Sequence, residues 1–346
     1  MRATDIATIS IDKDEERHAV ELHRRSIVVD CGSVVKQEPA HFERAKQGGV
    51  TATNHTVTHP NSDAATALKD IASCRQWIAR NPTEVVLATT TEDIREAKAT
   101  NREGVILGPQ NTDFLGPDLS LLGEFAELGV RILQLTYQKQ NWVGSGCGEA
   151  RDSGLSAFGH QLVSAMDDRG IVVDLSHCGP VTGADAIKAS RNPVIFSHAH
   201  PARIAPHIRA KSDDLLKALA AKGGVIGITA LSMFLYDPAH PKERPGLPAF
   251  VRHIQYLIDL IGIDHVGIGL DFDETNTEEK WDAWRREVPE LDTGWSFGER
   301  RIRDLTNAAD EVNITRALVG AGLSDGDIQK ILGLNFLRVF DQVWKS

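Results

Sequence analysis

Two stretches decide the fold: IVVDLSH at residues 171–177 and PVIFSHA at residues 193–199. Each is a short, β-branched, continuously apolar run that ends in polar residues, and a helical stretch separates them. A run of this kind is typical of a strand that is buried on both faces of a parallel sheet. The two stretches therefore predict neighbouring parallel strands whose polar ends lie on the same side.

The same pattern recurs along the chain and predicts eight strands in all. The other six runs are at residues 27–33, 50–57, 104–110, 130–137, 225–231 and 265–273. Alternating strands and helices form a parallel sheet, and eight such units favour closure into a (β/α)8 TIM barrel; a doubly wound open sheet is the alternative. A ninth run, VVLATT at 85–90, does not fit the count and is interpreted as an accessory strand.

The segments between these strands read as amphipathic helices. Examples are residues 61–79, 155–168, 212–221 and 250–261, the third opening on Ser212 as a cap. The closing segment, residues 324–343, predicts a capped helix, a Gly-Leu-Asn turn and a last helix on the barrel exterior. No repeat or linker is visible, so we expect one (β/α)8-barrel domain over residues 1–346, with N-terminal and C-terminal helical extensions.

The composition limits the function classes. Hydrophobic residues make up 41% and charged residues 25%, as in soluble globular enzymes. A net charge of −10 without any Lys/Arg run argues against a nucleic-acid partner. The charged N-terminal segment has no apolar leader core, and no apolar run approaches the roughly 18 residues of a membrane span, so we expect a cytoplasmic protein without a membrane partner.

Cysteine spacing gives no sign of a cross-link. Cys31, Cys74, Cys147 and Cys178 match no zinc-finger or disulfide pattern. In a cytoplasmic chain we expect all four to be reduced.

Polar residues at the strand ends form the candidate site, because the loops that follow the strands of such a barrel converge on one face. His177 and His198 end neighbouring strands, which suits a shared Zn²⁺ at about 2.1 Å from each nitrogen. The alternative is that each imidazole only binds backbone at a strand end. Asp271 ends the last strand and is a candidate base or ligand, whereas Asp273 fits a cap or turn better. Arg209 follows the sixth strand and suits a carboxylate, or it is a solvated surface charge.

These residues lie within long signatures that resemble the membrane (renal) dipeptidase family of metallo-amidohydrolases. The signatures are GLSAFGHQLVSAMDDRGIVVDLSH, PVIFSHAHPARIAPHIRAKSDDLLKALAAKGGVIGI, HVGIGLDFD and ILGLNFLRVF. The resemblance implies a two-zinc barrel that cleaves dipeptides. It also implies that His177 and His198 hold one zinc, that Arg209 grips the dipeptide carboxylate, and that Asp271 stands beside the metals.

The chain departs from the family pattern at three strand ends. Where the family has Asp-Gly-His-Asn-Asp, with two ligands of the first zinc, this chain has Asp30-Cys-Gly-Ser-Val34. The bridging glutamate appears as Gln110, a weak neutral ligand, and the histidine of the fourth strand appears as Tyr137. The resemblance is therefore to a divergent branch, and we expect one remaining zinc ion at His177, His198 and Gln110, with the second zinc site lost.

Other polar residues of the loops are open to two interpretations. His55 and His59 end the second strand and either join the pocket, with His55 as a substrate contact, or are ordinary loop residues. Cys147 and Glu149 either supply the charge that the metal lacks or are solvated.

Three functions remain. The first is a dipeptidase-like metallohydrolase of a small amide or dipeptide-like carboxylate, with Asp271 as the base, Tyr137 at the oxyanion and Arg209 on the substrate carboxylate. The second uses the same pocket for proton transfer without hydrolysis, as in elimination or isomerisation. The third is a non-catalytic carboxylate-binding protein. The expected partner is the small-molecule substrate, together with a possible second copy in a homodimer.

Overall fold

Eight parallel strands form the centre of the computed structural model, which describes residues 2–6, 9–35, 37–287, 289–291 and 294–344. The barrel strands are β3 (Val29–Val34), β4 (Ala52–His55), β6 (Glu103–Leu107), β7 (Ile132–Gln134), β8 (Val172–Asp174), β9 (Ile195–Ala199), β10 (Val225–Ile228) and β11 (Val266–Ile268). They are hydrogen-bonded in this order, and β11 returns to β3 through the pair Ile268–Asp30. A parallel bridge from Leu107 to Val130 joins β6 to the start of β7 and closes the ring. The predicted (β/α)8 barrel is confirmed.

The described residues form four further strands outside this ring. The accessory strand was expected, and β5 (Val85–Leu87) pairs in parallel with β6 outside the ring. The short β12 (Phe272–Asp273) pairs in parallel with the end of β3, at Ser33 and Val34. An antiparallel hairpin of β1 (Arg2–Ile6) and β2 (Ile9–Asp12) precedes the first helix, so the N-terminal extension is not helical throughout.

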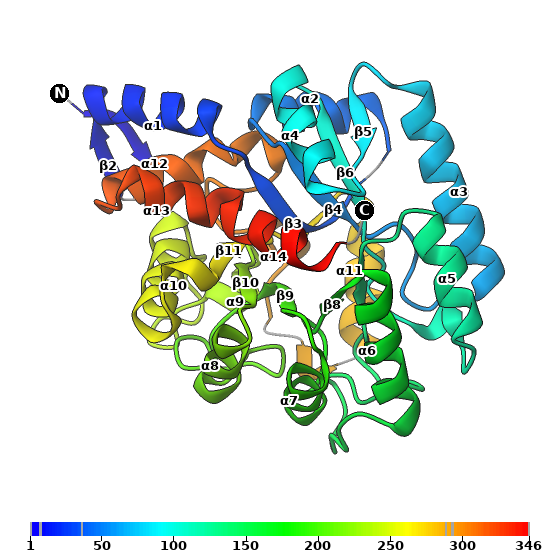
Figure 1. Ribbon diagram of the computed structural model, residues 1–346. Coiled ribbons are helices and arrows are strands. Elements are labelled where there is room, and N and C mark those ends of the chain that lie inside the picture. The colour runs from blue at the N-terminus through cyan, green and yellow to red at the C-terminus, as the bar shows by residue number, and fades with distance from the viewer. Residues whose placement is uncertain (1, 7–8, 36, 288, 292–293, 345–346) are drawn as a thin grey trace.

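Helices surround the barrel, as Figure 1 shows. They are α1 (Lys13–Arg25), α2 (Pro39–Gln47), α3 (Ala64–Arg80), α4 (Thr91–Thr100), α5 (Ser120–Glu127), α6 (Ala157–Arg169), α7 (Pro180–Ala189), α8 (Asp213–Ala221), α9 (Ser232–Leu235), α10 (Leu247–Ile261), α11 (Glu278–Glu287), α12 (Val312–Gly320), α13 (Asp325–Gln329) and α14 (Asn335–Val343). Short 3₁₀ turns cover Asp113–Leu115, Ile263–His265, Pro289–Leu291, Phe297–Glu299 and Ala308–Asp310. No helix in the described part of the chain combines the length and apolar character that a membrane crossing requires.

Side-chain caps fix where several helices begin. Ser212 accepts a hydrogen bond from the backbone N–H of Leu215, as the sequence predicts for α8. The helix expected from residue 61 begins instead at Ala64, because the carboxylate of Asp63 accepts from the N–H of Thr66. The capping residue, and not the first residue of the periodic pattern, sets the boundary.

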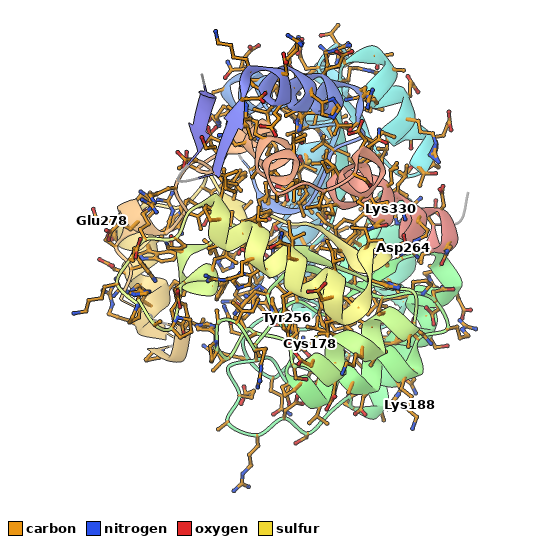
Figure 2. All side chains as sticks on the ribbon, turned by 90° about the vertical axis from the view of Figure 1, so that its left-hand side faces the viewer. Cys178, Lys188, Tyr256, Asp264, Glu278 and Lys330 are labelled. Atoms are coloured by element: carbon orange, nitrogen blue, oxygen red, sulfur yellow. The ribbon has the colours of Figure 1, made fainter. Side chains whose placement is uncertain are left out.

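The C-terminal segment differs from the prediction in two respects. Residues Lys330–Leu334 form a π-helical segment that joins α13 to α14, so the predicted Gly-Leu-Asn turn is wrong. A Cβ at Gly333 would lie 2.6 Å from the carbonyl oxygen of Ile27, so the helix packs directly on backbone there. Figure 2 shows Lys330 beside Asp264, and the Nζ–Oδ1 distance of this ion pair is 2.7 Å.

The last helix, α14, covers the amino end of the barrel and does not pack on its outer side as predicted. Phe336, Phe340 and Val343 belong to one buried cluster with inward-facing residues near the amino ends of the strands, among them Val29 and Ala52. A Cβ at Gly267 would lie 2.5 Å from Cε2 of Phe336, so the ring fills the space that a β11 side chain would occupy. In Figure 1, α14 lies across the strands near the centre of the molecule. The opposite, carboxyl end of the barrel therefore holds the open cavity.

Candidate active site

A cavity of about 690 Å³ opens at the carboxyl ends of the strands. This volume is in the usual range for small-molecule sites. Its lining includes five residues that the sequence selected as candidates: Gln110, Tyr137, His177, Arg209 and Asp271. The remaining wall is partly aromatic, with Phe234, Trp281 and Trp284, and partly basic, with Arg300 and Arg301.

The two predicted histidines face each other. Nε2 of His177 lies 3.0 Å from Nε2 of His198, and both side chains are buried. Burial, together with the nearby Arg209, holds the pKa of both imidazoles well below the usual value, so both rings are neutral. A hydrogen bond between two neutral rings needs one donor and one acceptor.

Hydrogen-bond partners decide which ring donates. Arg209 Nη1 lies 3.0 Å from Nδ1 of His177, and a guanidinium can only donate, so this Nδ1 accepts and the proton of His177 is on Nε2. His198 Nδ1 lies 2.8 Å from Ser197 Oγ, whose own proton goes to Asp174 Oδ2 at 2.6 Å. His198 therefore carries its proton on Nδ1 and accepts the proton of His177 at Nε2.

The carboxylate of Asp174 anchors this series of hydrogen bonds from inside the barrel. Its Oδ1 accepts from the backbone N–H groups of Ser176 and Ser197 and from the hydroxyl of Ser176, at 2.6–3.0 Å. The result is one continuous series of hydrogen bonds that links the ends of β8 and β9 to Arg209.

Arg209 is buried but keeps donors for a ligand. Beyond His177, its Nη2 donates to the carbonyl oxygen of His198 at 3.3 Å, and its Nε has no partner among the described residues. A guanidinium carries five N–H donors, so donors remain for an anion in the cavity.

Asp271 supplies the carboxyl group of the cavity. Its backbone is left-handed (φ 57°), and its N–H donates to the carbonyl oxygen of Gly32 at 2.7 Å. Burial raises the pKa of Asp271 to about 6, against the opposing effects of Arg301 and Arg209. A carboxyl group with this pKa can take up and release a proton near neutral pH.

Tyr137 covers one face of the histidine pair. Its ring stacks on that of His177, with centroids 4.2 Å apart and planes at 21°. Burial and the nearby Asp271 raise the pKa of Tyr137 well above its usual value, so the phenol remains protonated and can donate a hydrogen bond.

Other predicted residues occupy different places. Gln110 lines the cavity, and its Nε2 donates to Thr56 Oγ1 at 2.7 Å. His59 lines the outer part of the cavity and is exposed. Cys147 is absent from the lining, and its thiol lies 3.3 Å from Gln138 Oε1. Glu149 accepts from the backbone N–H of Gln140 at 2.7 Å and so stabilises its own loop.

His55 does not line this cavity, contrary to the predicted substrate contact. Its neighbour Asn54 points into the barrel and bonds the Cys31 carbonyl oxygen, whereas the His55 ring lies on the outer wall. There His55 meets His41 of α2 and Glu103 of β6, and their ligand atoms lie within 4.8 Å of one another. Sequence reasoning missed His41 and Glu103, because no motif in the chain joins positions 41, 55 and 103.

Arg301 also escaped the sequence analysis. It is buried, its Nη1 donates to the backbone oxygen of Asp271, and it lines the cavity. Arg301 comes from the segment between β12 and α12, which has no strand pattern. Its position beside Asp271 therefore could not be predicted from the sequence.

The histidine pair at the mouth of the barrel, where the cavity opens at the carboxyl ends of the strands, does not fit a zinc ion in this arrangement. His177 and His198 belong to no group of three His, Cys, Asp or Glu ligands in the described residues. Arg209 places the proton of His177 on Nε2, the atom that faces His198 and that would have to bind the metal. The charged side chains that act on both imidazoles, Arg209 and Lys211, are positive and disfavour a cation. The zinc ion expected at His177, His198 and Gln110 therefore stays a prediction.

The sequence profile of the membrane dipeptidase family (peptidase family M19) matches residues 18–285. This chain belongs to the membrane dipeptidase family. Among its curated relatives, dipeptidase verJ of Clonostachys rogersoniana is 30% identical over 272 residues, which are 77% of this chain and 62% of that protein. Dipeptidase aclJ of Aspergillus oryzae is 30% identical over 266 residues, 76% of this chain and 57% of the relative. The chain thus spans about six-tenths of the length of these relatives.

Solved structures share the whole barrel. An amidohydrolase from Pseudomonas aeruginosa is 32% identical, with a TM-score of 0.87 over 94% of this chain and 99% of that one. A metallo peptidase from Rhodobacter sphaeroides, liganded with a phosphinate mimic of the dipeptide L-Ala-D-Ala, is 18% identical, with a TM-score of 0.77 over 92% and 100%. The second likeness concerns the fold alone. The predicted family membership is confirmed.

Proposed function

We propose that this protein hydrolyses a small amide that carries a carboxylate, such as a dipeptide-like compound, in the cavity at the barrel mouth. Family membership supports the reaction class. The observation that carries the proposal is the convergence of Arg209, Asp271 and Tyr137 on one cavity of small-molecule size.

Each of the three side chains has a role that its surroundings favour. The free donors of Arg209 bind the substrate carboxylate. Asp271, ionised above pH 6, accepts a proton from a water molecule while the water oxygen bonds to the amide carbon. Tyr137 donates a hydrogen bond to the amide oxygen as it becomes negative. Asp271 then returns the proton to the amine nitrogen, and the carbon–nitrogen bond breaks.

A second candidate is proton transfer on a small carboxylate without hydrolysis. The absence of a third ligand beside His177 and His198 in the described residues favours it, because isomerisation or elimination needs only an acid and a base. The same three side chains would serve, with Asp271 as the base and Tyr137 as the donor.

Mass spectrometry separates the candidates. The purified protein is incubated with a set of dipeptides and N-acyl amino acids. Hydrolysis gives two products whose summed mass exceeds that of the substrate by one water, isomerisation leaves the mass unchanged, and elimination divides the substrate without added water. Two hydrolysis products would support the first proposal, and either other pattern would replace it.

The variant Asp271→Asn tests the assigned base. Asn also tolerates the left-handed backbone, so the fold is kept. We expect kcat/KM to fall about 10²–10⁴-fold, as for loss of a general base. In the parent protein kcat/KM should rise with pH through about 6, where Asp271 loses its proton, and the variant should lack this rise. The control is Asp304→Asn, another left-handed aspartate, exposed and away from the cavity. A fully active Asp271→Asn protein contradicts the assignment.

A further inference from the structure

Three side chains on the outer barrel wall form a second cluster, separate from the mouth. His41 comes from α2, His55 from the end of β4 and Glu103 from the start of β6. They are 2%, 1% and 4% exposed, so water satisfies none of them fully. The proposed reaction uses none of these side chains.

The two hydrogen bonds to Glu103 in this cluster are longer than tight ones. Oε1 of Glu103 lies 3.3 Å from Nε2 of His41 and 3.4 Å from Nε2 of His55. A charge-assisted N–H···O⁻ bond is about 2.7–2.9 Å long, so both contacts are too long for a tight ion pair. Around a tetrahedral zinc ion with bonds of about 2.0–2.1 Å, neighbouring ligand atoms lie about 3.3–3.4 Å apart. Both distances from Glu103 match those between neighbouring ligands of a zinc ion.

Polar atoms without partners also point to a missing group. Oε2 of Glu103 and Nδ1 of His55 are buried and have no hydrogen-bond partner among the described residues. Buried polar atoms are almost always paired, so an unpaired carboxylate oxygen beside two imidazoles requires an explanation.

The surroundings orient the ligands as in known metal sites. Nδ1 of His41 lies 3.1 Å from Oε2 of Glu274, which leaves Nε2 directed at Glu103. Arg44 holds the other oxygen of Glu274 through Nε and Nη2, at 2.9 and 2.6 Å. A carboxylate behind a metal-binding histidine fixes the ring and makes it a better ligand.

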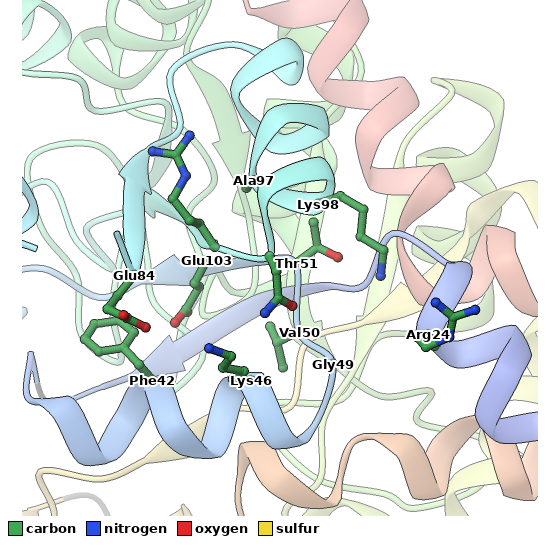
Figure 3. Close-up of a pocket in the computed structure, with 12 residues that line it drawn as sticks. Arg24, Phe42, Lys46, Gly49, Val50, Thr51, Glu84, Ala97, Lys98 and Glu103 are labelled. Carbon is green, nitrogen blue, oxygen red and sulfur yellow. The ribbon is translucent and has the colours of Figure 1, made fainter. Parts of the chain in front are cut away.

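We propose that His41, His55 and Glu103 bind one zinc ion. Two imidazoles and a carboxylate are a typical donor set for zinc, with the fourth position left to water. A cavity of about 370 Å³ reaches Glu103 and provides a path to the ion. In Figure 3 the Glu103 carboxylate points from the strand toward α2, near Phe42 and Lys46. Arg24, Lys46 and Lys98 also line this cavity, and the buried Glu103 carboxylate supplies the negative charge that faces the ion.

The ion would fasten α2 to the outer wall. Its ligands come from one helix and two paired strands, so binding closes chain segments between residues 41, 55 and 103. Such an ion stabilises the fold and takes no part in the chemistry at the mouth, from which the barrel wall separates it.

Metal content measured on matched variants tests the proposal. The full-length protein is loaded with zinc chloride, desalted and analysed for zinc. We expect one zinc ion per chain in the parent protein and in His177→Ala, and at least a tenfold lower content in Glu103→Gln. The control is Glu84→Gln, which removes the same charge from the same cavity and should keep its zinc. Zinc that is lost in His177→Ala but kept in Glu103→Gln overturns the proposal, as does a parent protein that retains none.

Anomalous X-ray scattering at the zinc edge locates the ion without any variant. The expected result is a peak between His41, His55 and Glu103 in crystals of the parent protein. A peak beside His177 and His198 alone, or no peak, overturns the proposal even if Glu103→Gln does not fold. Neither experiment depends on activity, so failure of the proposed hydrolysis leaves this test intact.

Discussion

Arg209 acts on the candidate site in two ways at once. It lines the cavity with free donors, and through Nη1 it fixes which nitrogen of His177 carries the proton. A substrate carboxylate that draws the guanidinium away from Nδ1 of His177 would therefore change the hydrogen bonds of the histidine pair.

We predict that Arg209→Lys raises KM more than it lowers kcat. Lysine keeps the charge but loses the two parallel donors that match a carboxylate. A hydrogen bond to a charged group contributes about 1.5–3 kcal/mol, so KM should rise about 10–100-fold. Steady-state kinetics on the substrate found by mass spectrometry measure this change. Arg203→Lys, at an exposed position of the same loop, is the control. An unchanged KM would remove Arg209 from substrate binding.

At the residue scale, the sequence predicted the residues of the strand ends better than their orientations. His177, Arg209 and Asp271 follow strands whose limits the apolar runs define, and all three line the cavity. His55 illustrates the failure. Alternate residues of a strand point to opposite faces, so a shift of one position separates the interior Asn54 from the exterior His55. The polar run NHTVTHP contains no apolar alternation from which this register could be read.

At the element scale, α14 and β11 depend on each other for packing. Gly267 has no side chain, and the ring of Phe336 occupies the space beside it. A larger side chain at either position would displace the other residue.

We predict that Gly267→Ala destabilises the protein by about 1–3 kcal/mol, as overpacking of a core does. The clash is relieved in Gly267→Ala/Phe336→Leu, so the double variant should be more stable than the sum of the single changes implies. Denaturant unfolding of the single and double variants measures the coupling. Gly326→Ala on α13 is the control, since its Cβ would make only an ordinary contact, 4.0 Å from Oγ of Ser324. Full additivity would show that the two positions do not interact.

The C-terminal segment shows why element boundaries are hard to predict. Gly333, Leu334 and Asn335 resemble a turn, because glycine and asparagine commonly end helices. The π-helical segment continues instead, and Asn335 Nδ2 donates to the carbonyl oxygens of Ile263 and Val266. Distant backbone acceptors override the local preference, and a local pattern cannot contain them.

At the scale of the whole molecule, Asp30 helps to close the ring. Its carboxylate accepts from the N–H groups of Gly32 and Leu270, at 3.2 and 2.8 Å, and from the hydroxyl of Ser33 at 2.5 Å, so it joins β3 to the chain after β11. Burial nevertheless raises the pKa of Asp30 to about 6. Because the folded value exceeds the usual 3.8, this group favours folding at low pH, and its contribution is lost as the pH rises through about 6.

We predict that Asp30→Asn removes this pH dependence. Relative to the parent protein, the variant should gain stability between pH 4 and pH 7, by at most about 3 kcal/mol for a shift of roughly two pH units. Asparagine can still accept from both N–H groups, and the Ser33 hydroxyl can turn to accept from it. Denaturant unfolding at the two pH values measures the difference. A constant difference between the proteins would show that Asp30 does not titrate as described.

The closed barrel was predictable from alternation alone, because eight apolar runs separated by helices leave few other arrangements. The N-terminal hairpin and the segment between β12 and α12 were not, since neither repeats the alternation. The three-residue cluster at the outer wall depends on how α2 packs on the barrel, which no spacing in the chain encodes.

The place of α14 also has a consequence for folding during synthesis. This helix follows every barrel strand in the chain, yet it covers the apolar residues at the amino ends of those strands. Until α14 has been synthesised, the apolar residues at the amino ends of the strands remain exposed. Exposed apolar surface of this kind promotes aggregation. The barrel can therefore reach its final packing only after translation has passed α14, and chaperone contact before that point is expected at the end of the barrel opposite the cavity.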